Sequence, residues 1–142
     1  MEILGHGFYY QDWHEGYEFQ TLTRTITETD ILNFVGVSGM TEELFTSQEY
    51  LETHTDFTGR LVPGALVFSM AEGLVIPATI SRTGIAFLNC EIDIKSPTFA
   101  GDTIFRASDA ASARHAGPGA WRTVLPTWSM RCFQSARCAS GC

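Results

Sequence analysis

The fold is decided by the stretch PGALVFSMAEGLV, residues 63–75. Proline is favoured in the first turn of a helix, because an N–H at that position has no hydrogen-bond acceptor within the helix. The stretch therefore predicts a long helix that starts at Pro63. Its apolar residues recur at helical spacing but lie on nearly all sides of the helix. A helix of this kind cannot rest on a surface, and we expect the remaining chain to wrap around it.

The residues after this helix change to a period of two, which is typical of a half-buried strand. Apolar side chains alternate with mostly polar ones from Ala86 to Lys95, with Ala86, Leu88, Cys90, Ile92 and Ile94 expected on the inner face. Pro97 and a turn at Gly101-Asp102 end this strand, and Thr103 to Ala107 predicts the next one. Trp121 to Phe133 predicts a weaker strand, because Pro126 removes a ladder donor.

The part of the chain before residue 63 predicts one strand and two short helices. Tyr17 to Ile26 mixes aromatic residues with threonine, a composition typical of strands. Thr27 is an N-cap with Asp30 three positions later, so a helix should start there and end at Gly39. Ser47 is expected to cap a second short helix that runs to about His54.

Together these elements predict an α+β protein in which a curled antiparallel sheet surrounds one long helix. With 142 residues the chain is expected to form a single domain, 1–142. A single sheet of this kind leaves an unpaired edge, and pairing of two copies is the natural way to cover it. We therefore expect a homodimer.

Charge and composition exclude several classes of function. The net charge is −7 and Lys95 is the only lysine, which argues against binding nucleic acid. The N-terminus does not have the pattern of a secretion signal, and the apolar stretch from Leu61 to Ile80 is interrupted by prolines and a glutamate, so a cytoplasmic protein without a membrane span is expected. No histidines or cysteines have metal-ligand spacing, and we expect neither a metal nor a cofactor.

The last part of the chain differs from the rest. Residues 106–142 contain five of the nine basic residues but one of the sixteen acidic ones, and three of the four cysteines. This region is either a basic extension or an altered end of the coding sequence. The sequence leaves both open, and we expect Ser135 to Cys142 to be mobile and to lie outside the sheet.

Two segments, SGMTEELF (residues 38–45) and GRLVPGALV (residues 59–67), resemble the active-site region of the MaoC-like (R)-specific enoyl-CoA hydratases and dehydratases. In that family, which has the hotdog fold, a short helix ends in Ser-Gly-Asp and a His follows five residues after the Asp. Here Met40 and Phe45 occupy those two places. The resemblance implies a hotdog fold, a trans-2-enoyl thioester as substrate in a tunnel beside the central helix, and a homodimer.

The resemblance also suggests roles for residues around the start of the long helix. The family holds the thioester oxygen with a backbone N–H at this place, which corresponds to Gly64; the alternative is a glycine required for close packing. We assign Met40, Phe45, Arg60 and Pro63 to substrate binding. Arg60 is expected either to contact a phosphate of the carrier or to brace the helix start.

Met40 and Phe45 cannot transfer protons, so another acid or base is needed for hydration. Glu42 and Glu43 lie in the same loop, and Glu42 is closer to the missing Asp. Glu72 lies inside the apolar helix, where burial of a carboxylate is costly unless the group has a partner or a function. Its alternatives are exposure at the surface or pairing with an arginine across a dimer contact.

Three functions are consistent with these residues. The first is a hydratase or dehydratase with an altered active site that acts on an acyl-CoA or acyl-carrier thioester. The second is a non-catalytic subunit that binds the thioester and forms a heterodimer with a catalytically complete hotdog subunit. The third is a hotdog acyl-CoA thioesterase that uses Glu72.

Overall fold

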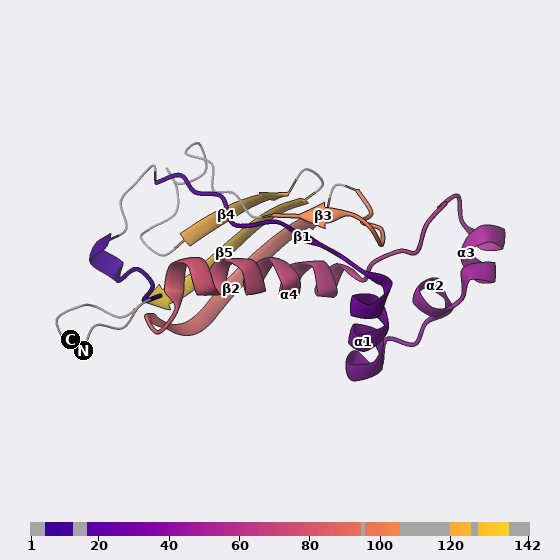
Figure 1. Ribbon diagram of the computed structural model, residues 1–142, viewed down its shortest axis with the longest axis horizontal. Coiled ribbons are helices and arrows are strands. Elements are labelled where there is room, and N and C mark those ends of the chain that lie inside the picture. Colours follow the sequence, from indigo (N-terminus) through magenta and orange to yellow (C-terminus); the bar gives the residue numbers. More distant parts are fainter. Residues whose placement is uncertain (1–4, 13–16, 95, 106–119, 126–127, 137–142) are drawn as a thin grey trace.

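The centre of the fold is α4 (Gly64–Val75), which follows Pro63 and continues into one π-helical turn, η2 (Ile76–Ile80). The computed structural model describes residues 5–12, 17–94, 96–105, 120–125 and 128–136, the last two ranges by their backbone (Figure 1). Pro77 lies within η2 and has no N–H to donate, which accounts for the change from α to π geometry. As its sequence predicts, α4 is buried along most of its length, at Leu66, Val67, Met70, Ala71, Glu72 and Val75.

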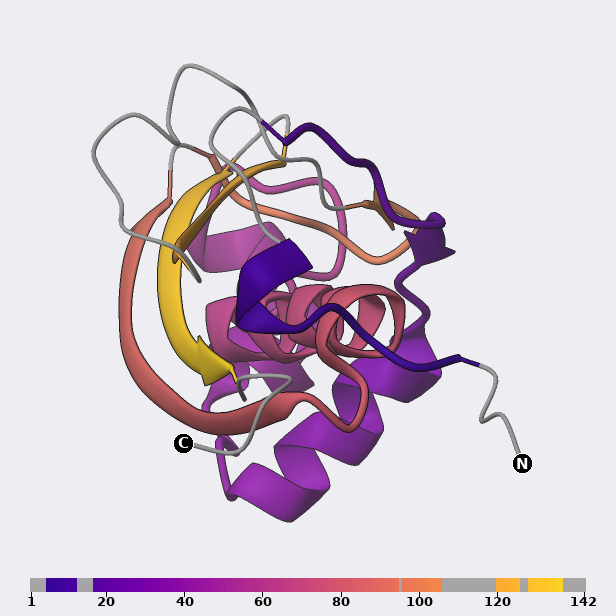
Figure 2. The same cartoon turned by 90° about the vertical axis from the view of Figure 1, so that its left-hand side faces the viewer.

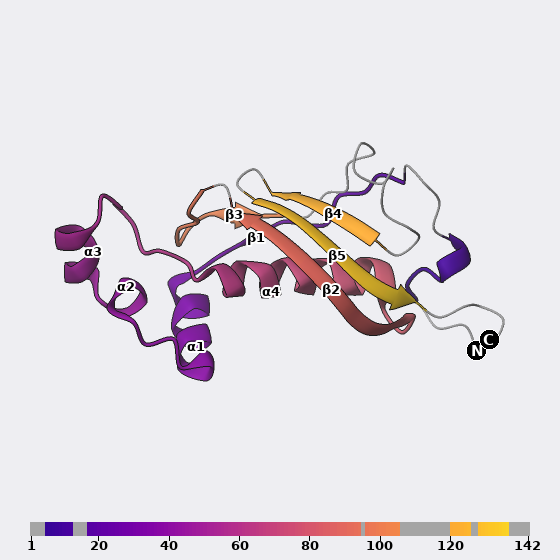
Figure 3. The same ribbon diagram turned by 180° about the vertical axis from the view of Figure 1, so that it is seen from behind.

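A curved antiparallel sheet wraps one side of α4. β2 (Gly84–Ile94) pairs with β5 (Trp128–Ala136), which pairs in turn with β4 (Ala120–Leu125), so the strand order is β2-β5-β4. Seen along α4, β2 and β5 curve around the helix (Figure 2). Seen from behind, the three strands cross α4 diagonally (Figure 3). The sheet curls but does not close, and this is the hotdog arrangement predicted from the sequence.

A second, two-stranded sheet joins the N-terminal part of the chain to the segment after β2. β1 (Arg24–Thr25) pairs antiparallel with β3 (Thr103–Ile104), and the hydroxyls of Thr25 and Thr103 lie 2.7 Å apart. Around this pair, the Ile26 amide donates to the Asp102 carbonyl at 2.9 Å. The predicted turn at Gly101-Asp102 is present, with Gly101 at a φ of 95°.

Three strand predictions differ from the structure. The strand expected from Tyr17 to Ile26 is limited to Arg24–Thr25 as β1. The single strand expected from Trp121 to Phe133 is two strands, β4 and β5, which pair antiparallel with each other. Of the strand expected from Thr103 to Ala107, β3 includes Thr103 and Ile104, and Arg106 and Ala107 lie outside the described residues.

The end of the chain is partly inside the sheet. Ser135 pairs with Ala86 and Ala136 with Gly84, so the expectation that the mobile tail starts at Ser135 is wrong for these two residues. Their pairing extends the long β2–β5 ladder, whose backbone hydrogen bonds outweigh the weak strand propensity of small residues. The rest of the predicted tail, 137–142, lies outside the described residues.

The alternation of β2 is interrupted, contrary to the regular pattern expected. Its pairing with β5 shifts register between Phe87 and Asn89. Across this irregularity, the Phe87 ring lies 6.0 Å from that of Phe68 on α4, while Cys90 packs against Ala71 of the same helix. An extra residue in one strand reverses the faces beyond it, and for this reason Phe87, expected outside, contacts the helix. Toward the end of β2, Ile92 and Ile94 are exposed.

The helices before α4 begin and end as their capping residues predict. α1 (Glu28–Ser38) has a complete capping box between Thr27 and Asp30, and Gly39 ends it in the left-handed conformation at a φ of 72°. α3 (Gln48–His54) is capped by the Ser47 side chain. The sequence did not predict α2 (Glu43–Thr46), a single turn between them.

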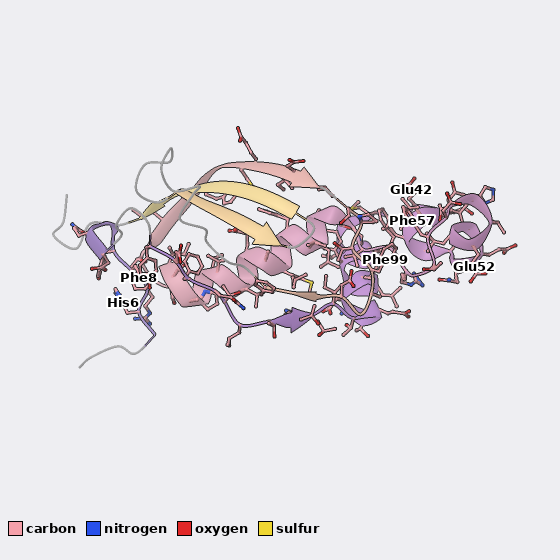
Figure 4. All side chains as sticks on the ribbon, turned by 90° about the horizontal axis from the view of Figure 1, so that it is seen from above. His6, Phe8, Glu42, Glu52, Phe57 and Phe99 are labelled. Atoms are coloured by element: carbon pink, nitrogen blue, oxygen red, sulfur yellow. The ribbon has the colours of Figure 1, made fainter. Side chains whose placement is uncertain are left out.

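Residues 41–59, which include α2 and α3, form the α2–α3 arm. This arm extends away from α4 and the sheet at the end of the molecule where α4 begins (Figure 1). Its carboxylates, among them Glu42 and Glu52, point outward, and Phe57 approaches Phe99 where the arm meets the rest of the protein (Figure 4). The two phenyl rings make an edge contact with centroids 5.6 Å apart.

The main core lies between α1, the start of α4 and β3. Burial of these side chains is the main driving force for packing the three elements together. Its buried members are Ile26, Ile31, Val35, Phe45, Val62, Leu66, Val67, Met70 and Ile104.

At the other end of α4, Gly7 and Phe8 of the N-terminal segment make backbone hydrogen bonds to η2 and to the residue that follows it. The Gly7 amide donates to the Ser81 carbonyl at 2.9 Å, and the Phe8 amide donates to the Thr79 carbonyl at 2.6 Å. A short 3-10 turn, η1 (Tyr10–Asp12), follows. Within the described part of the chain, no helix combines the length and apolarity that a membrane crossing needs.

Candidate active site

The loop that resembles the hydratase site begins at the end of α1. The Ser38 hydroxyl donates to the Phe34 carbonyl at 2.6 Å, and Gly39 reverses the chain direction. A left-handed residue is strained for most side chains, which explains why glycine follows Ser38. Met40 comes next, half-buried and packed against the main core. At this place the chain presents a thioether and no proton-transfer group.

Phe45 is a core residue. It lies in the middle of α2, with 8% of its surface exposed, and belongs to the same buried cluster as Val62 and Leu66 beside the start of α4. The position therefore anchors the α2–α3 arm to the core by apolar contact. An aromatic hydrocarbon here excludes water from the place where the resemblance puts a histidine.

Glu42 and Glu43 lie at the start of α2 and are exposed. Glu42 is the N-cap residue, but its side chain makes no capping hydrogen bond, and Glu43 is the first helical residue. Negative charge at a helix N-terminus is favourable, although the effect of a single turn is small. Both carboxylates are in solvent at the base of the arm, so either has freedom to rotate toward a bound molecule.

The start of α4 offers free amide groups. Pro63 is buried and occupies the N-cap, one position before its expected place in the first turn, and Gly64 is the first helical residue and half-buried. The amides of the first helical turn have no intrahelical acceptor, apart from those that bond the cap carbonyl. Leu66 and Val67 donate to the Pro63 carbonyl at 2.9 and 3.3 Å, which leaves the Gly64 amide at the open end of the helix.

Glu72 is buried, with 8% of its surface exposed. It follows Gly64 by two turns, a rise of about 12 Å along α4. Its neighbours Ala71 and Val75 are both buried in the same helix. The expected alternative that Glu72 reaches the surface is therefore wrong, because α4 turns this position toward the interior. This rise separates the Glu72 position from Gly64 along the helix axis.

Arg60 braces the site. Its Nη1 donates a 2.7 Å hydrogen bond to the Phe45 carbonyl. The Arg60 carbonyl accepts from the Ala100 amide at 2.9 Å, and the Val62 amide donates to the Thr98 carbonyl at 2.9 Å, so the backbone before α4 is held on both sides of Leu61. The side chain thus links the arm to the segment that leads into α4.

The other ionisable groups do not form a second catalytic cluster within the described residues. His54 stacks on Tyr50 at the exposed end of α3, with centroids 4.5 Å apart, and His6 contacts Tyr9. No group of three metal-binding side chains lies together among the residues that the structure describes. Asp30 has a lowered pKa, mainly because the Thr27 hydroxyl and amide donate to its carboxylate, with Arg24 contributing further.

A protein of known activity aligns with much of this chain. The (R)-specific enoyl-CoA hydratase of Rhodospirillum rubrum is 30% identical over 96 residues, which make up 68% of this chain and 65% of the relative. This similarity supports the MaoC-like family that the two segments resemble. It matches no protein-family model. The alignment spans less than two thirds of the relative's length.

Solved structures agree with the hotdog fold of this chain. The unliganded R-hydratase of Pseudomonas aeruginosa superimposes with a TM-score of 0.75 at 18% identity, covering 93% of this chain and 87% of that protein. A MaoC domain dehydratase of Chloroflexus aurantiacus gives a TM-score of 0.78 at 20% identity, covering 94% of this chain but 41% of that one. Identities this low establish the shared fold alone.

The fold brings some of the predicted residues together and separates others. Met40, Phe45, Arg60 and Pro63 meet around the start of α4, close to Gly64. Glu42 and Glu43 lie one turn or less from Phe45 but on the outer side of α2, and Glu72 lies deeper along α4. The sequence did not reveal the contact of Phe57 with Phe99, since the partners are distant along the chain and neither residue type indicates the other.

Proposed function

We propose that this protein is an acyl-thioester hydratase or dehydratase of the enoyl-CoA type with an altered active site. Such an enzyme adds the hydroxyl of water to C3 and a proton to C2 of a trans-2-enoyl thioester, or reverses this step. The name of the relative from Rhodospirillum rubrum supports the substrate class. One structural observation carries the proposal: the loop after α1 and the open start of α4 pack on one core, where a thioester carbonyl would meet the Gly64 amide.

The Gly64 amide is the proposed oxyanion donor. During water addition, negative charge develops on the thioester oxygen, and an amide at a helix N-terminus stabilises it by about 3 kcal/mol. Pro63 supports this role because it has no N–H of its own and fixes the approach to the helix. Met40 and Phe45 would then form the apolar wall next to the acyl chain.

Proton transfer is assigned to a glutamate. Glu42 or Glu43 would activate water in the place of the missing Asp and His, since both stand at the base of the arm beside the buried Phe45. General acid–base catalysis of this kind contributes about 10²–10⁴-fold. Without it the protein would bind thioesters and hydrate them feebly.

Enoyl-CoA thioesters of several chain lengths test the proposal, with loss of the conjugated double bond followed by absorbance. We expect turnover in the parent and a loss of about 10²-fold or more in Glu42→Gln or Glu43→Gln. Glu49→Gln and Glu52→Gln are matched controls, because they remove exposed carboxylates from the same arm. Equal turnover in all four variants would remove both glutamates from the mechanism, and no turnover in the parent would contradict the hydratase.

Burial of Phe45 favours one other function, that of a non-catalytic subunit that binds acyl thioesters beside a complete hotdog partner. The double variant Met40→Asp with Phe45→His restores the pair implied by the family. Hydration that appears in this variant but not in the parent would support the partner role. The histidine would occupy a buried place, so circular dichroism must first show that the variant is folded.

Burial of Glu72 favours a third function, hydrolysis of the thioester. A carboxylate in the helix would activate water for attack on the thioester carbonyl, which releases the acid and the free thiol of the carrier. Release of thiol, measured with a disulfide chromophore, distinguishes hydrolysis from hydration. Thiol release that is lost in Glu72→Gln and kept in Glu42→Gln would replace our first proposal with this one.

For assembly, we propose a homodimer, with a heterodimer as the alternative. One edge of β2 has no partner among the described strands, and Ile85, Phe87, Ile92 and Ile94 along it are exposed. Exposed apolar strands at a sheet edge favour pairing with another chain. Light scattering of the purified protein tests this, and a monomer would contradict it. A cytoplasmic role in fatty acid metabolism belongs to the same proposal.

A further inference from the structure

Arg60 joins two parts of the candidate site that are separate in sequence. Its guanidinium donates to the carbonyl of Phe45, 15 residues earlier. It is the only Lys or Arg between residues 25 and 81, a segment with eight acidic residues. Its guanidinium nevertheless donates to a peptide carbonyl and not to one of these carboxylates.

The Phe45 carbonyl belongs to the C-terminal end of α2, which has only four residues. A single turn is not stable by itself, and its last carbonyls have no intrahelical donor. A cationic donor at this end satisfies one carbonyl and complements the helix dipole. Arg60 therefore stabilises α2 from outside, together with the burial of Phe45.

The position of Arg60 makes this hydrogen bond a link to α4. The backbone of Arg60 is fixed to the segment that precedes β3. The Ala100 amide donates to the Arg60 carbonyl, and the next residue, Leu61, forms an isolated antiparallel β-bridge with Phe99. Gly64 follows four residues later along the same fixed segment. When the Arg60 side chain binds the end of α2, it sets the distance between α2 and the Gly64 amide.

We propose that Arg60 is a positioning residue that holds α2, with Glu42 and Glu43, beside the start of α4, and that it does not bind the carrier's phosphates. The inference rests on the proposed function for its catalytic consequence. Whether Arg60 holds α2 in place can be measured by hydrogen exchange, without any enzymatic turnover.

The test compares Arg60→Met, which keeps a flexible apolar stem without the donors, with Arg60→Lys, which keeps the charge and one donor group. Arg82→Met is the control, since it removes one positive charge from an exposed site after η2. Backbone hydrogen exchange of residues 43–54 and of 66–75 is followed by mass spectrometry in the intact chain. Steady-state constants for an enoyl-CoA thioester are measured in parallel.

We expect exchange in α2 and α3 to accelerate about tenfold or more in Arg60→Met, with α4 unchanged, because the last turn of α2 loses its donor. Arg60→Lys should restore part of the protection, and Arg82→Met should change nothing. In an active parent, kcat should fall about tenfold in Arg60→Met while KM stays within about twofold, since positioning affects the reacting groups and not the carrier.

Other outcomes would overturn the inference. Unchanged exchange with a raised KM would assign Arg60 to phosphate binding, and so would a KM defect that Arg60→Lys repairs fully. An inactive parent defeats the proposed function alone, because the exchange experiment still decides whether Arg60 holds α2. If Arg60→Met does not fold, hydrogen exchange of α2 and α3 in Arg60→Lys is the deciding measurement. If α2 and α3 are as well protected in Arg60→Lys as in the parent, the guanidinium is not needed to hold α2.

Discussion

α4 and the α2–α3 arm both border the candidate site, but they are stabilised in different ways. α4 is buried along most of its length and covered by a curved sheet. The arm is attached through Phe45, through the hydrogen bond from Arg60, and through the edge contact of Phe57 with Phe99. The proposed oxyanion donor therefore belongs to the buried part of the protein, whereas the proposed catalytic glutamates belong to a part held by a few contacts.

The strongest test of this comparison uses two equally buried residues. Ile31 on α1 and Leu51 on α3 are 0% and 1% exposed. Ile31→Ala should lower the free energy of unfolding by about 2–5 kcal/mol, because it leaves a cavity in the main core. Leu51→Ala should mostly loosen the arm, with accelerated hydrogen exchange in α3 and a smaller change in denaturant midpoint. Equal losses of global stability would show that the arm and the core unfold as one unit.

The N-terminal segment provides the next largest effect, at the far end of α4. A Cβ at Gly7 would lie 2.5 Å from the Ser81 amide nitrogen and 2.7 Å from the backbone of Ile80. Gly7→Ala should therefore destabilise by about 1–3 kcal/mol, since backbone atoms have to move. Gly36→Ala is the matched control, because a Cβ there meets nothing within 4 Å. A thermal midpoint as high as that of the control would mean that the segment is not pinned to η2.

A smaller effect is expected at the start of α1, which connects the buried part to the arm. Thr27→Ala removes the hydroxyl that accepts from the Asp30 amide at 3.2 Å and donates to its carboxylate at 2.7 Å. Loss of such a cap costs about 1 kcal/mol. Chemical denaturation measures it, and Thr29→Ala, on the exposed side of the same turn, is the control. If the two variants are equally stable, the capping box contributes nothing measurable.

The smallest predicted effect is a dependence on pH. The pKa of Asp30 is lowered in the folded protein, chiefly by the hydrogen bonds from Thr27. A carboxyl group with a lowered folded pKa stabilises the protein above its unfolded pKa, and this contribution is lost as the pH falls through the folded value. NMR titration should therefore place Asp30 below an ordinary aspartate, and Thr27→Ala should move it back up. A titration that Thr27→Ala leaves unchanged would assign the shift to another cause.

Local chemistry explains what the sequence predicted correctly. The capping residues Thr27 and Ser47 and the terminating Gly39 act on neighbours within a few positions, so their roles follow from the sequence alone. The all-round apolar pattern of residues 63–75 likewise required a wrapped helix. The hotdog fold could be predicted because these signals agree with one another.

Non-local pairing explains what the sequence could not reveal. The shift of register within β2 depends on its partner β5, about 45 residues later in the chain. The burial of Phe45 and the hydrogen bond from Arg60 depend on how the arm packs, and neither has a signature in residue spacing. For the candidate site, the sequence therefore named candidate residues, while the structure shows which of them are buried, which are exposed and which make hydrogen bonds.

The pairing of β1 with β3 has a consequence for the time course of folding. Thr103 follows Thr25 by 78 positions in the sequence, so β1 finds its partner only after that part of the chain has been made. At a synthesis rate of about 5–20 residues per second, this strand waits for several seconds, while α1 can form at once from its own capping residues. β1 is thus made before α1 but finds its partner after α1 can form.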